Sequence, residues 1–205
     1  MADEKRPYRK KRRAELEAQT AQRITESAVA LHSTLGPSRT SISAVAKHAG
    51  VRRSTVYRYF PDEAALFAAC TGHWMAANPL PDLGCWAAID DPDQRLATAL
   101  NELYAHYGRT EQMMQNILRD ESTMPIVKQM FAGYRDYLAA ARDTLMRGRP
   151  LRGGARQRVI AAIGHALAFA TWYSLTREEG LGGTQAADLM CCLVAATTTD
   201  PRRRV

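Results

Sequence analysis

The spacing of apolar residues in the first 78 positions predicts four consecutive helices. Apolar residues recur every three or four positions from Leu16 to Leu35, which marks one face of an amphipathic helix ending at Gly36-Pro37. A short second helix is predicted between a capping Ser41 and Gly50, and a third spans residues 54–60 and stops at Pro61. Acidic residues at 62 and 63 suit the positive end of a fourth helix, which runs to residue 78.

A loop rich in Pro, Asp and Gly, residues 79–92, predicts a domain boundary. Beyond it, helical periodicity predicts five more helices over about 93–108, 110–122, 125–148, 153–179 and 184–198. No alternating strand pattern of useful length occurs. We therefore expect an all-α protein of about nine helices. It would comprise a disordered basic arm (1–13), a domain of three helices and a supporting fourth (14–78), and a second helical domain (79–205).

Positive charge is concentrated in the first third of the chain. Residues 1–60 contain 13 Lys and Arg against 5 Asp and Glu, whereas residues 61–205 contain 15 against 16, so the net charge of +7 comes from the N-terminal segment. A compact basic segment joined to a nearly neutral one indicates a polyanion-binding module attached to a domain of another kind.

The composition is that of an ordinary globular protein, with 46% hydrophobic and 24% charged residues. No run of about 18 uninterrupted apolar residues occurs, which argues against a membrane-spanning helix. The N-terminal charges are not followed by an apolar stretch, so no secretory signal is expected and the predicted location is the cytoplasm. The four cysteines lack paired CxxC spacing and are expected to be free thiols there.

Residues that could support catalysis or metal binding are sparse. Cys70 and His73 share a helix face but have no further ligands nearby in the pattern, so core packing is the favoured interpretation. A redox role for the adjacent Cys191 and Cys192 is a minor alternative, and His165 on an apolar helix fits a core position. No nucleophile elbow, phosphate loop or zinc-protease motif is present. We expect no enzymatic activity, no metal and no cofactor.

Two short helices joined by a glycine-containing turn are the sequence form of a helix-turn-helix, and residues 41–60 fit it. Gly50 can adopt the positive φ that a chain reversal needs, while Val45 and Val56 hold the two helices together. The opposite face of the third helix is rich in donors to phosphates and base edges, namely Arg53, Ser54, Thr55, Arg58 and Tyr59. A merely solvated polar face is the alternative.

Residues 41–66 read SISAVAKHAGVRRSTVYRYFPDEAAL and resemble the signature of TetR-type regulators. Thr55, Tyr57 and Phe60 match the family's Thr-x-Tyr-x-x-Phe recognition helix, and the resemblance covers roughly residues 14–78. It implies that Val45, Ala49, Val56 and Phe60 are structural. The residues that it and the charge pattern place against DNA are Ser41, Arg52, Arg53, Ser54, Thr55, Tyr57, Arg58 and Tyr59.

Two positions depart from the family pattern. Arg52 stands where the family often has a capping Ser, which weakens the start of the recognition helix. Glu63 stands where the family often has a phosphate-binding Lys, so phosphate anchoring has to shift to Arg52, Arg53, Arg58 and the arm. We expect the arm to strengthen binding along the adjacent groove and steepen its salt dependence, with a solubility tail as the alternative.

The C-terminal domain is rich in Met and aromatic residues, which line pockets for apolar ligands and also fill ordinary cores. Combined with the resemblance, they suggest an effector pocket lined by Trp74, Tyr104, Tyr107, Met114, Leu118, Tyr134 and Phe169. Apolar stripes on the last two helices predict a four-helix dimer interface through Ile160, Ile163, Leu167, Leu189 and Leu193. Closure of the same stripes into one intramolecular core is the monomeric alternative.

The leading hypothesis is a homodimeric repressor that binds near-palindromic double-stranded DNA and is released by a small, largely apolar effector. Effector binding would displace the fourth helix through Leu66, Phe67 and Trp74. The alternatives are an effector-independent regulator and a dimer that binds nucleic acid without sequence choice.

Overall fold

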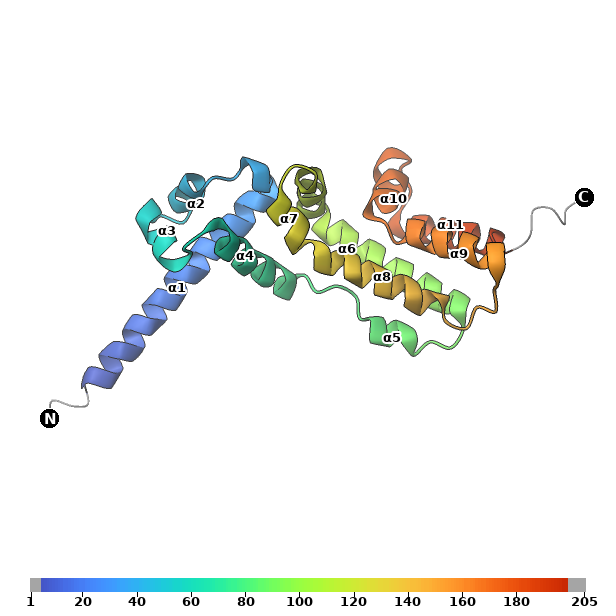
Figure 1. Cartoon of the computed structure of the whole chain (residues 1–205), viewed down its shortest axis with the longest axis horizontal. Coiled ribbons are helices and arrows are strands. Elements are labelled where there is room, and N and C mark those ends of the chain that lie inside the picture. The colour runs from blue at the N-terminus through green and yellow to red at the C-terminus, as the bar shows by residue number, and fades with distance from the viewer. Residues whose placement is uncertain (1–4, 199–205) are drawn as a thin grey trace, which may run out of the picture. The chain divides into compact units, whose positions relative to one another are not determined.

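The computed structural model describes residues 5–198, which are helical with short connections and contain no β-strand (Figure 1). The all-α prediction is confirmed. The chain divides into two compact units. The first contains the residues up to Asn78 together with Gln115–Met130, and the second contains Pro79–Met114 and the residues from Phe131 onward.

The first unit is built from short capped helices around one long one. Its elements are α1 (Lys5–Thr34), a 3₁₀ turn (Pro37–Arg39), α2 (Ile42–His48), α3 (Arg53–Tyr59), α4 (Glu63–Ala77), the end of α6 (Pro92–Glu121) and α7 (Pro125–Met130). The Ser41 hydroxyl accepts from the Ala44 amide at 3.1 Å and starts α2, as predicted. The Asp62 carboxylate accepts from the Ala65 amide at 2.7 Å and starts α4.

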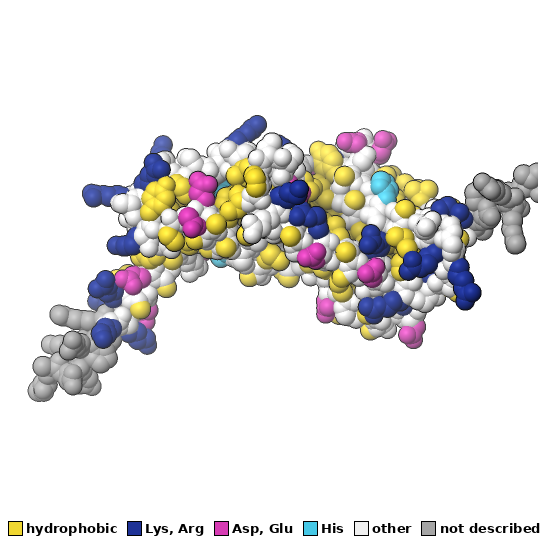
Figure 2. Space-filling view, in the orientation of Figure 1, with side chains coloured by type: hydrophobic (Ala, Val, Ile, Leu, Met, Phe, Trp, Pro, Cys, Tyr) yellow, Lys and Arg dark blue, Asp and Glu magenta, His cyan; other side chains and the backbone are white. Residues whose placement is uncertain are grey.

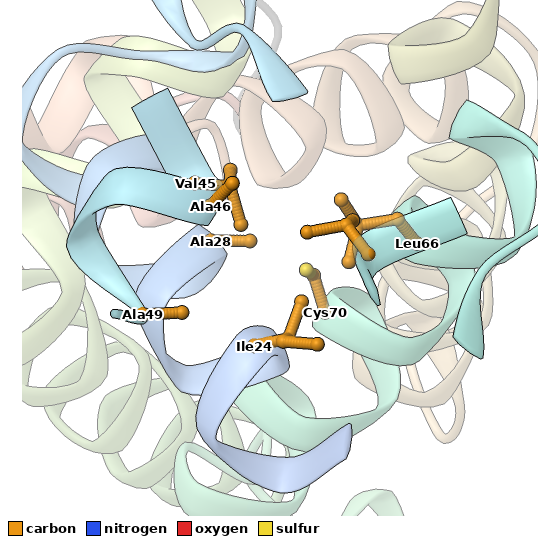
Figure 3. Close-up of a cluster of buried hydrophobic side chains, with 8 residues drawn as sticks. Ile24, Ala28, Val45, Ala46, Ala49, Leu66 and Cys70 are labelled. Atoms are coloured by element: carbon orange, nitrogen blue, oxygen red, sulfur yellow. The ribbon is translucent and has the colours of Figure 1, made fainter. Parts of the chain in front are cut away.

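Small and branched apolar side chains from α1, α2, α3 and α4 meet in one buried cluster. Figure 3 shows α1 contributing Ile24 and Ala28 to this cluster, α2 contributing Val45 and Ala46, and α4 contributing Leu66 and Cys70. Val56 of α3 is fully buried in the same cluster. Because α2 and α3 span only 7 residues each and are too short to be stable alone, burial in this shared core fixes the orientation of α3.

The second unit packs its helices around the first part of α6. Its other elements are α5 (Leu83–Ala87), α8 (Ala132–Met146), α9 (Gly153–Ala166), α10 (Phe169–Tyr173), a π-helical turn (Ser174–Glu178) and α11 (Gly183–Ala196). Large side chains that are almost fully buried include Trp86, Tyr104, Tyr107, Leu145 and Trp172.

Two buried tyrosines of α6 stabilise the break between α9 and α10. The Tyr104 hydroxyl donates to the Ala166 carbonyl at 2.9 Å, and the Tyr107 hydroxyl donates to the Leu167 carbonyl at 2.6 Å. Because a carbonyl can only accept, the Tyr107 hydroxyl uses its proton in the bond to Leu167. In the 2.6 Å contact between the hydroxyls of Tyr107 and Tyr134, Tyr134 is therefore the donor. The carbonyls that the helix break frees are therefore satisfied by side chains.

Several predicted helix boundaries are wrong. The two helices expected over 93–122 are the single helix α6, which continues through Gly108 because one glycine inside a long helix costs only about 1 kcal/mol. Residues 125–148 are divided into α7 and α8, and residues 153–179 are divided at Leu167-Ala168. The expected loop 79–92 contains α5, which the Asp82 carboxylate caps by accepting from the Gly84 amide at 2.8 Å. The apolar pattern continues across the breaks between α7 and α8 and between α9 and α10, so it could not locate these helix ends.

The N-terminal segment also differs from expectation. Residues 5–13 continue α1 instead of forming a disordered arm, and residues 1–4 lie outside the described residues. Lys and Arg are good helix formers, and Arg13 pairs with Glu17 one turn later at 3.0 Å. Leu16, expected on the core-facing stripe, is 56% exposed, and Leu35 at the other end of the stripe is also exposed.

The first unit, which includes the chain up to Asn78, is not contiguous in sequence. Residues 115–130 belong to it as well. The Asn116 side chain donates to the carbonyls of His32 at 3.1 Å and Ser33 at 2.6 Å, and the Asp120 carboxylate accepts from the Ser38 amide at 2.9 Å. These bonds, which we call the α1–α6 latch, satisfy the backbone groups at the end of α1.

Among the described residues, no single helix is long and apolar enough to cross a membrane. Only α9 taken together with the segment Phe169–Glu178 reaches that length and composition, and the two are bent by 63°.

Candidate nucleic-acid interface

The turn between α2 and α3 has a defined geometry that depends on Gly50. Gly50 has φ of 64°, its amide donates to the Lys47 carbonyl at 3.2 Å, and the next amide, that of Val51, donates to the Ala46 carbonyl at 2.9 Å. This pair of bonds is a Schellman motif, which ends a helix and reverses the chain within two residues. The glycine predicted to allow the reversal does so.

One face of α3 is anchored in the core and the other faces solvent. Val56 is buried, and Tyr59 and Phe60 are half-buried against the same cluster. Arg53, Ser54, Tyr57 and Arg58 are exposed, while Thr55 is half-buried at the edge. The structure therefore brings the predicted DNA-facing residues of α3 onto one side. It differs from the prediction for Tyr59, whose ring belongs partly to the core.

Each exposed arginine of α3 is held by a tyrosine of the same helix. The Arg53 guanidinium donates to the Tyr57 hydroxyl at 3.0 Å and lies 5.4 Å from the centre of its ring. Arg58 donates to the Tyr59 hydroxyl at 3.2 Å and lies 5.0 Å from that ring. Such stacking restricts two long side chains that would otherwise lose much conformational freedom on binding. The alternation of Arg and Tyr was visible in the sequence, but the pairing was not predicted.

The helix N-termini next to α3 differ in the charge they present. Ser41 is exposed and uses its oxygen as a cap, which leaves its O–H free to donate to a phosphate. Arg52 makes no side-chain cap for α3, in agreement with the weakened start expected there. At α4, the exposed Asp62 and Glu63 put two carboxylates at the positive end of the helix. A phosphate is not favoured at α4, so the cations of α1 and α3 have to supply the attraction.

Cationic side chains surround this part of the molecule. Lys10, Lys11, Arg12 and Arg13 of α1 are exposed, as are Arg52, Arg53 and Arg58. Figure 2 shows Lys and Arg side chains projecting around α1–α3. Such a concentration of cations on a small helical unit favours a polyanionic partner.

The predicted pocket residues do not form one set within a single unit. Trp74 and Leu118 belong to the first unit, and Tyr104, Tyr107, Met114, Tyr134 and Phe169 belong to the second. Tyr104, Tyr107, Met114 and Phe169 are buried, and Tyr107 lies edge-on to Phe169 with ring centres 5.3 Å apart. With both hydroxyls bound to backbone carbonyls, Tyr104 and Tyr107 have clear structural roles, and their ligand-binding role stays a prediction.

The predicted dimer residues divide into two groups. Leu189 and Leu193 on α11 are 39% and 49% exposed, and Ile160 on α9 is half-buried. Ile163 and Leu167 are buried in the core of their own unit, so the prediction that they face a partner is wrong. Both groups lie on apolar helices, and the sequence pattern could not assign them to the inside or the outside.

The α1–α6 latch was not predicted from the sequence. Asn116, Arg119 and Asp120 read as ordinary polar residues near a helix end, and no signal in one sequence pairs them with residues 32–38. Arg119 binds the Leu35 carbonyl at 3.0 Å and pairs with Asp120 at 2.8 Å. Among the described residues no group of three or more His, Cys, Asp or Glu is arranged to hold a metal ion, and the four cysteines are free thiols.

Comparison with known proteins decides what kind of helix-turn-helix this is. Residues 24–70 match the family model described as bacterial regulatory proteins, tetR family. The helix-turn-helix unit belongs to the TetR family. The matched range begins at Ile24 and ends at Cys70, two members of the core cluster, so it spans the residues that orient α3. The matched segment is thus a helix-turn-helix of the TetR type, a fold that supports a DNA-binding regulator.

Solved structures extend the likeness to the whole fold. A TetR-like transcriptional regulator from Rhodococcus sp. RHA1 is 19% identical, with a TM-score of 0.61 over 86% of this chain and 93% of that one. A regulator from Clostridium perfringens is 14% identical, with a TM-score of 0.63 over 87% and 99% of the two chains. A TetR-family protein from Mesorhizobium loti is 16% identical, with a TM-score of 0.60 over 88% and 96%. At these identities the likeness concerns the fold alone. Among curated proteins, none matches the sequence.

Proposed function

We propose that this TetR-type regulator binds a specific operator as a homodimer and represses transcription until a small molecule releases it. The observation that carries the DNA-binding part is the geometry of α3. Its apolar residue Val56 is fixed in the core, while Arg53, Ser54, Tyr57 and Arg58 face outward together. A helix with this face fits the major groove, where guanidinium and hydroxyl groups donate to phosphates and base edges.

The decisive experiment uses duplexes selected from a randomised pool by the full-length protein. We expect replacement of Thr55, Tyr57 and Arg58 together by alanine to weaken binding of the selected duplex by about 100-fold or more, because several phosphate and base contacts are lost at once. Fluorescence anisotropy measures the affinity, and circular dichroism verifies the fold.

The matched control replaces Arg135, Arg147 and Arg152 by alanine, three exposed residues of the second unit that lie outside α9 and α11. The control should bind with wild-type affinity. Undiminished binding by a folded Thr55, Tyr57 and Arg58 variant would contradict the proposal.

An effector-independent regulator or a non-specific nucleic-acid-binding dimer is the second candidate, favoured by the excess of cations on α1. Competition distinguishes specific from non-specific binding, because a true operator should exceed bulk DNA in affinity by about a thousandfold or more. A ratio close to one would favour non-specific binding.

Dimerisation is proposed through the outward faces of α9 and α11. Two exposed leucines on the largely apolar helix α11 form an apolar surface that a second copy can cover. We expect Leu189→Lys/Leu193→Lys to be monomeric at micromolar concentration in sedimentation, with a folded helical spectrum and weakened operator binding. The matched control is Met75→Lys, another exposed apolar residue. A wild-type protein that sediments as a monomer would contradict the dimer.

Effector binding is proposed within the second unit, with an apolar ligand as the expected class. Two observations support this proposal. The rings of Tyr107, Phe169 and Trp172 pack together in the second unit, and α6 is a continuous helix that contributes residues to both units. A ligand that alters α6 within the second unit would act on the latch at the far end of the same helix. Displacement of α4 through Leu66, Phe67 and Trp74 remains the alternative route. A coupling free energy of about 1–3 kcal/mol is enough to change operator occupancy.

A further inference from the structure

In the N-terminal half of α1, the side chains that the structure describes are all exposed. Ile24 is the first buried residue of α1, and residues 10–19 are exposed on every side. Figure 1 shows this half of α1 projecting beyond α2, α3 and α4. At 1.5 Å per residue, residues 5–19 form a rod of roughly 22 Å. We call residues 5–19 the helical arm.

The helical arm is basic and is rooted beside the recognition helix. Lys10, Lys11, Arg12 and Arg13 are consecutive, exposed cations. The ion pair of Arg13 is with Glu17, another arm residue, so it does not attach the arm to the rest of the unit. The base of the arm continues to Ile24, which lies in the same core cluster as Val56 of α3. Any duplex bound by α3 therefore lies close to the arm.

The width of a helix restricts how the arm can meet DNA. An α-helix with its side chains is roughly 10–12 Å across, whereas the minor groove of B-DNA is roughly 6 Å wide. We infer that the helical arm lies over the phosphates that flank the site read by α3 and binds them without reading sequence. This inference rests on the proposed function, because α3 has to place the duplex beside the arm. It replaces the expectation of a flexible arm that enters an adjacent groove.

The arrangement of cations along the helical arm sets how strongly the arm should change the salt dependence of DNA binding. Successive helix residues point about 100° apart, so only about two of the four described cations face one duplex at a time. Each phosphate neutralised contributes roughly 0.9 to the slope of log affinity against log salt, which predicts a slope change of about 2. Because the arm is already helical, its binding does not require ordering of a disordered segment.

The test uses full-length protein and the selected duplex, prepared with and without roughly 10 base pairs of flanking DNA on each side. The flanks are made either A·T-rich or G·C-rich. We expect flanks of both kinds to raise affinity by about 10- to 100-fold, and Lys10→Gln/Lys11→Gln/Arg12→Gln to abolish this gain and lower the salt slope by about 2. The charge-matched control Arg135→Gln/Arg147→Gln/Arg152→Gln should keep the gain. Ala14→Pro, which breaks the helix and retains every charge, should reduce the gain.

Three results would overturn the inference. If flanks leave the affinity of wild-type protein unchanged, the arm is only a solubility element. If A·T-rich flanks bind much more tightly than G·C-rich flanks, or if Ala14→Pro retains the full gain, the arm reads the minor groove in an extended form. Failure of the proposed function looks different, because then the duplex without flanks is not bound specifically by any of the proteins.

Discussion

Replacing Gly36 by alanine is expected to lower the free energy of unfolding by about 3 kcal/mol. Gly36 has φ of 95° and ψ of 157°, in a backbone region that is essentially restricted to glycine and costs an L-residue about 1–3 kcal/mol. In addition, a Cβ at this position would collide with the guanidinium of Arg119 and approach the Asp120 carboxylate at 2.7 Å. The ion pair would have to move away from the end of α1, and the bond from Arg119 to the Leu35 carbonyl would be lost.

Gly50→Ala is the matched control, because Gly50 also has a positive φ of 64° but a Cβ there would meet nothing within 4 Å. It carries only the backbone cost, so we expect a loss of about 1 kcal/mol. Urea unfolding of both variants at pH 7 measures the difference. Equal losses would mean that the α1–α6 latch adds nothing to stability and that Gly36 matters only for its backbone.

The DNA-binding helices could be predicted from sequence because their determinants are local. The cap at Ser41, the positive φ at Gly50 and the carboxylates that start α4 each act within a few residues. Val56 was assigned to the core from helical spacing alone, and it is buried. These signals also carried the family resemblance, so the local and the family-based predictions depend on the same residues.

The features that could not be predicted from the sequence share a different physical cause. Asn116 and Asp120 bond to groups more than 80 residues away, and one sequence contains no signal for such a pairing. Apolar periodicity shows that a helix face is covered but not what covers it, so Ile163 and Leu189 looked alike although the first is buried in its own unit. The break at Leu167 was missed because tyrosine hydroxyls from α6 replace the helical bonds that are lost there.

Acidification is expected to destabilise the first unit through His32, the histidine near the C-terminal end of α1. Burial is the main cause that lowers the pKa of His32 to about 4, although the nearby Asp120 carboxylate opposes it. The ring is stacked on Phe67 with centres 4.8 Å apart, and it lines a small cavity of about 30 Å³ together with Ser41, Glu63 and Met124. Protonation would put a cation into this largely apolar site.

The sign of the effect follows from the two pKa values. The imidazole takes up its proton at about pH 6.5 when unfolded and at about pH 4 when folded, so the contribution to stability is complete above pH 6.5 and is lost progressively as the pH falls from 6.5 to 4. This predicts a loss of about 2 kcal/mol between pH 7 and pH 5, which rises to about 3 kcal/mol at pH 4. Hydrogen bonds from Arg119 and Ser38 outweigh burial and lower the pKa of Asp120, so its carboxylate stays charged at pH 5.

The variant His32→Phe isolates this contribution, because phenylalanine can keep the stack on Phe67 and has no proton to bind. Urea unfolding of both proteins at pH 7 and pH 5 gives the pH-dependent loss for each, and the loss should be smaller in the variant by about 2 kcal/mol. His106, whose pKa is also lowered, mainly by burial, is present in both proteins and cancels in the comparison. The same acid sensitivity in wild type and variant would show that His32 is not the group that makes the DNA-binding unit unstable in acid.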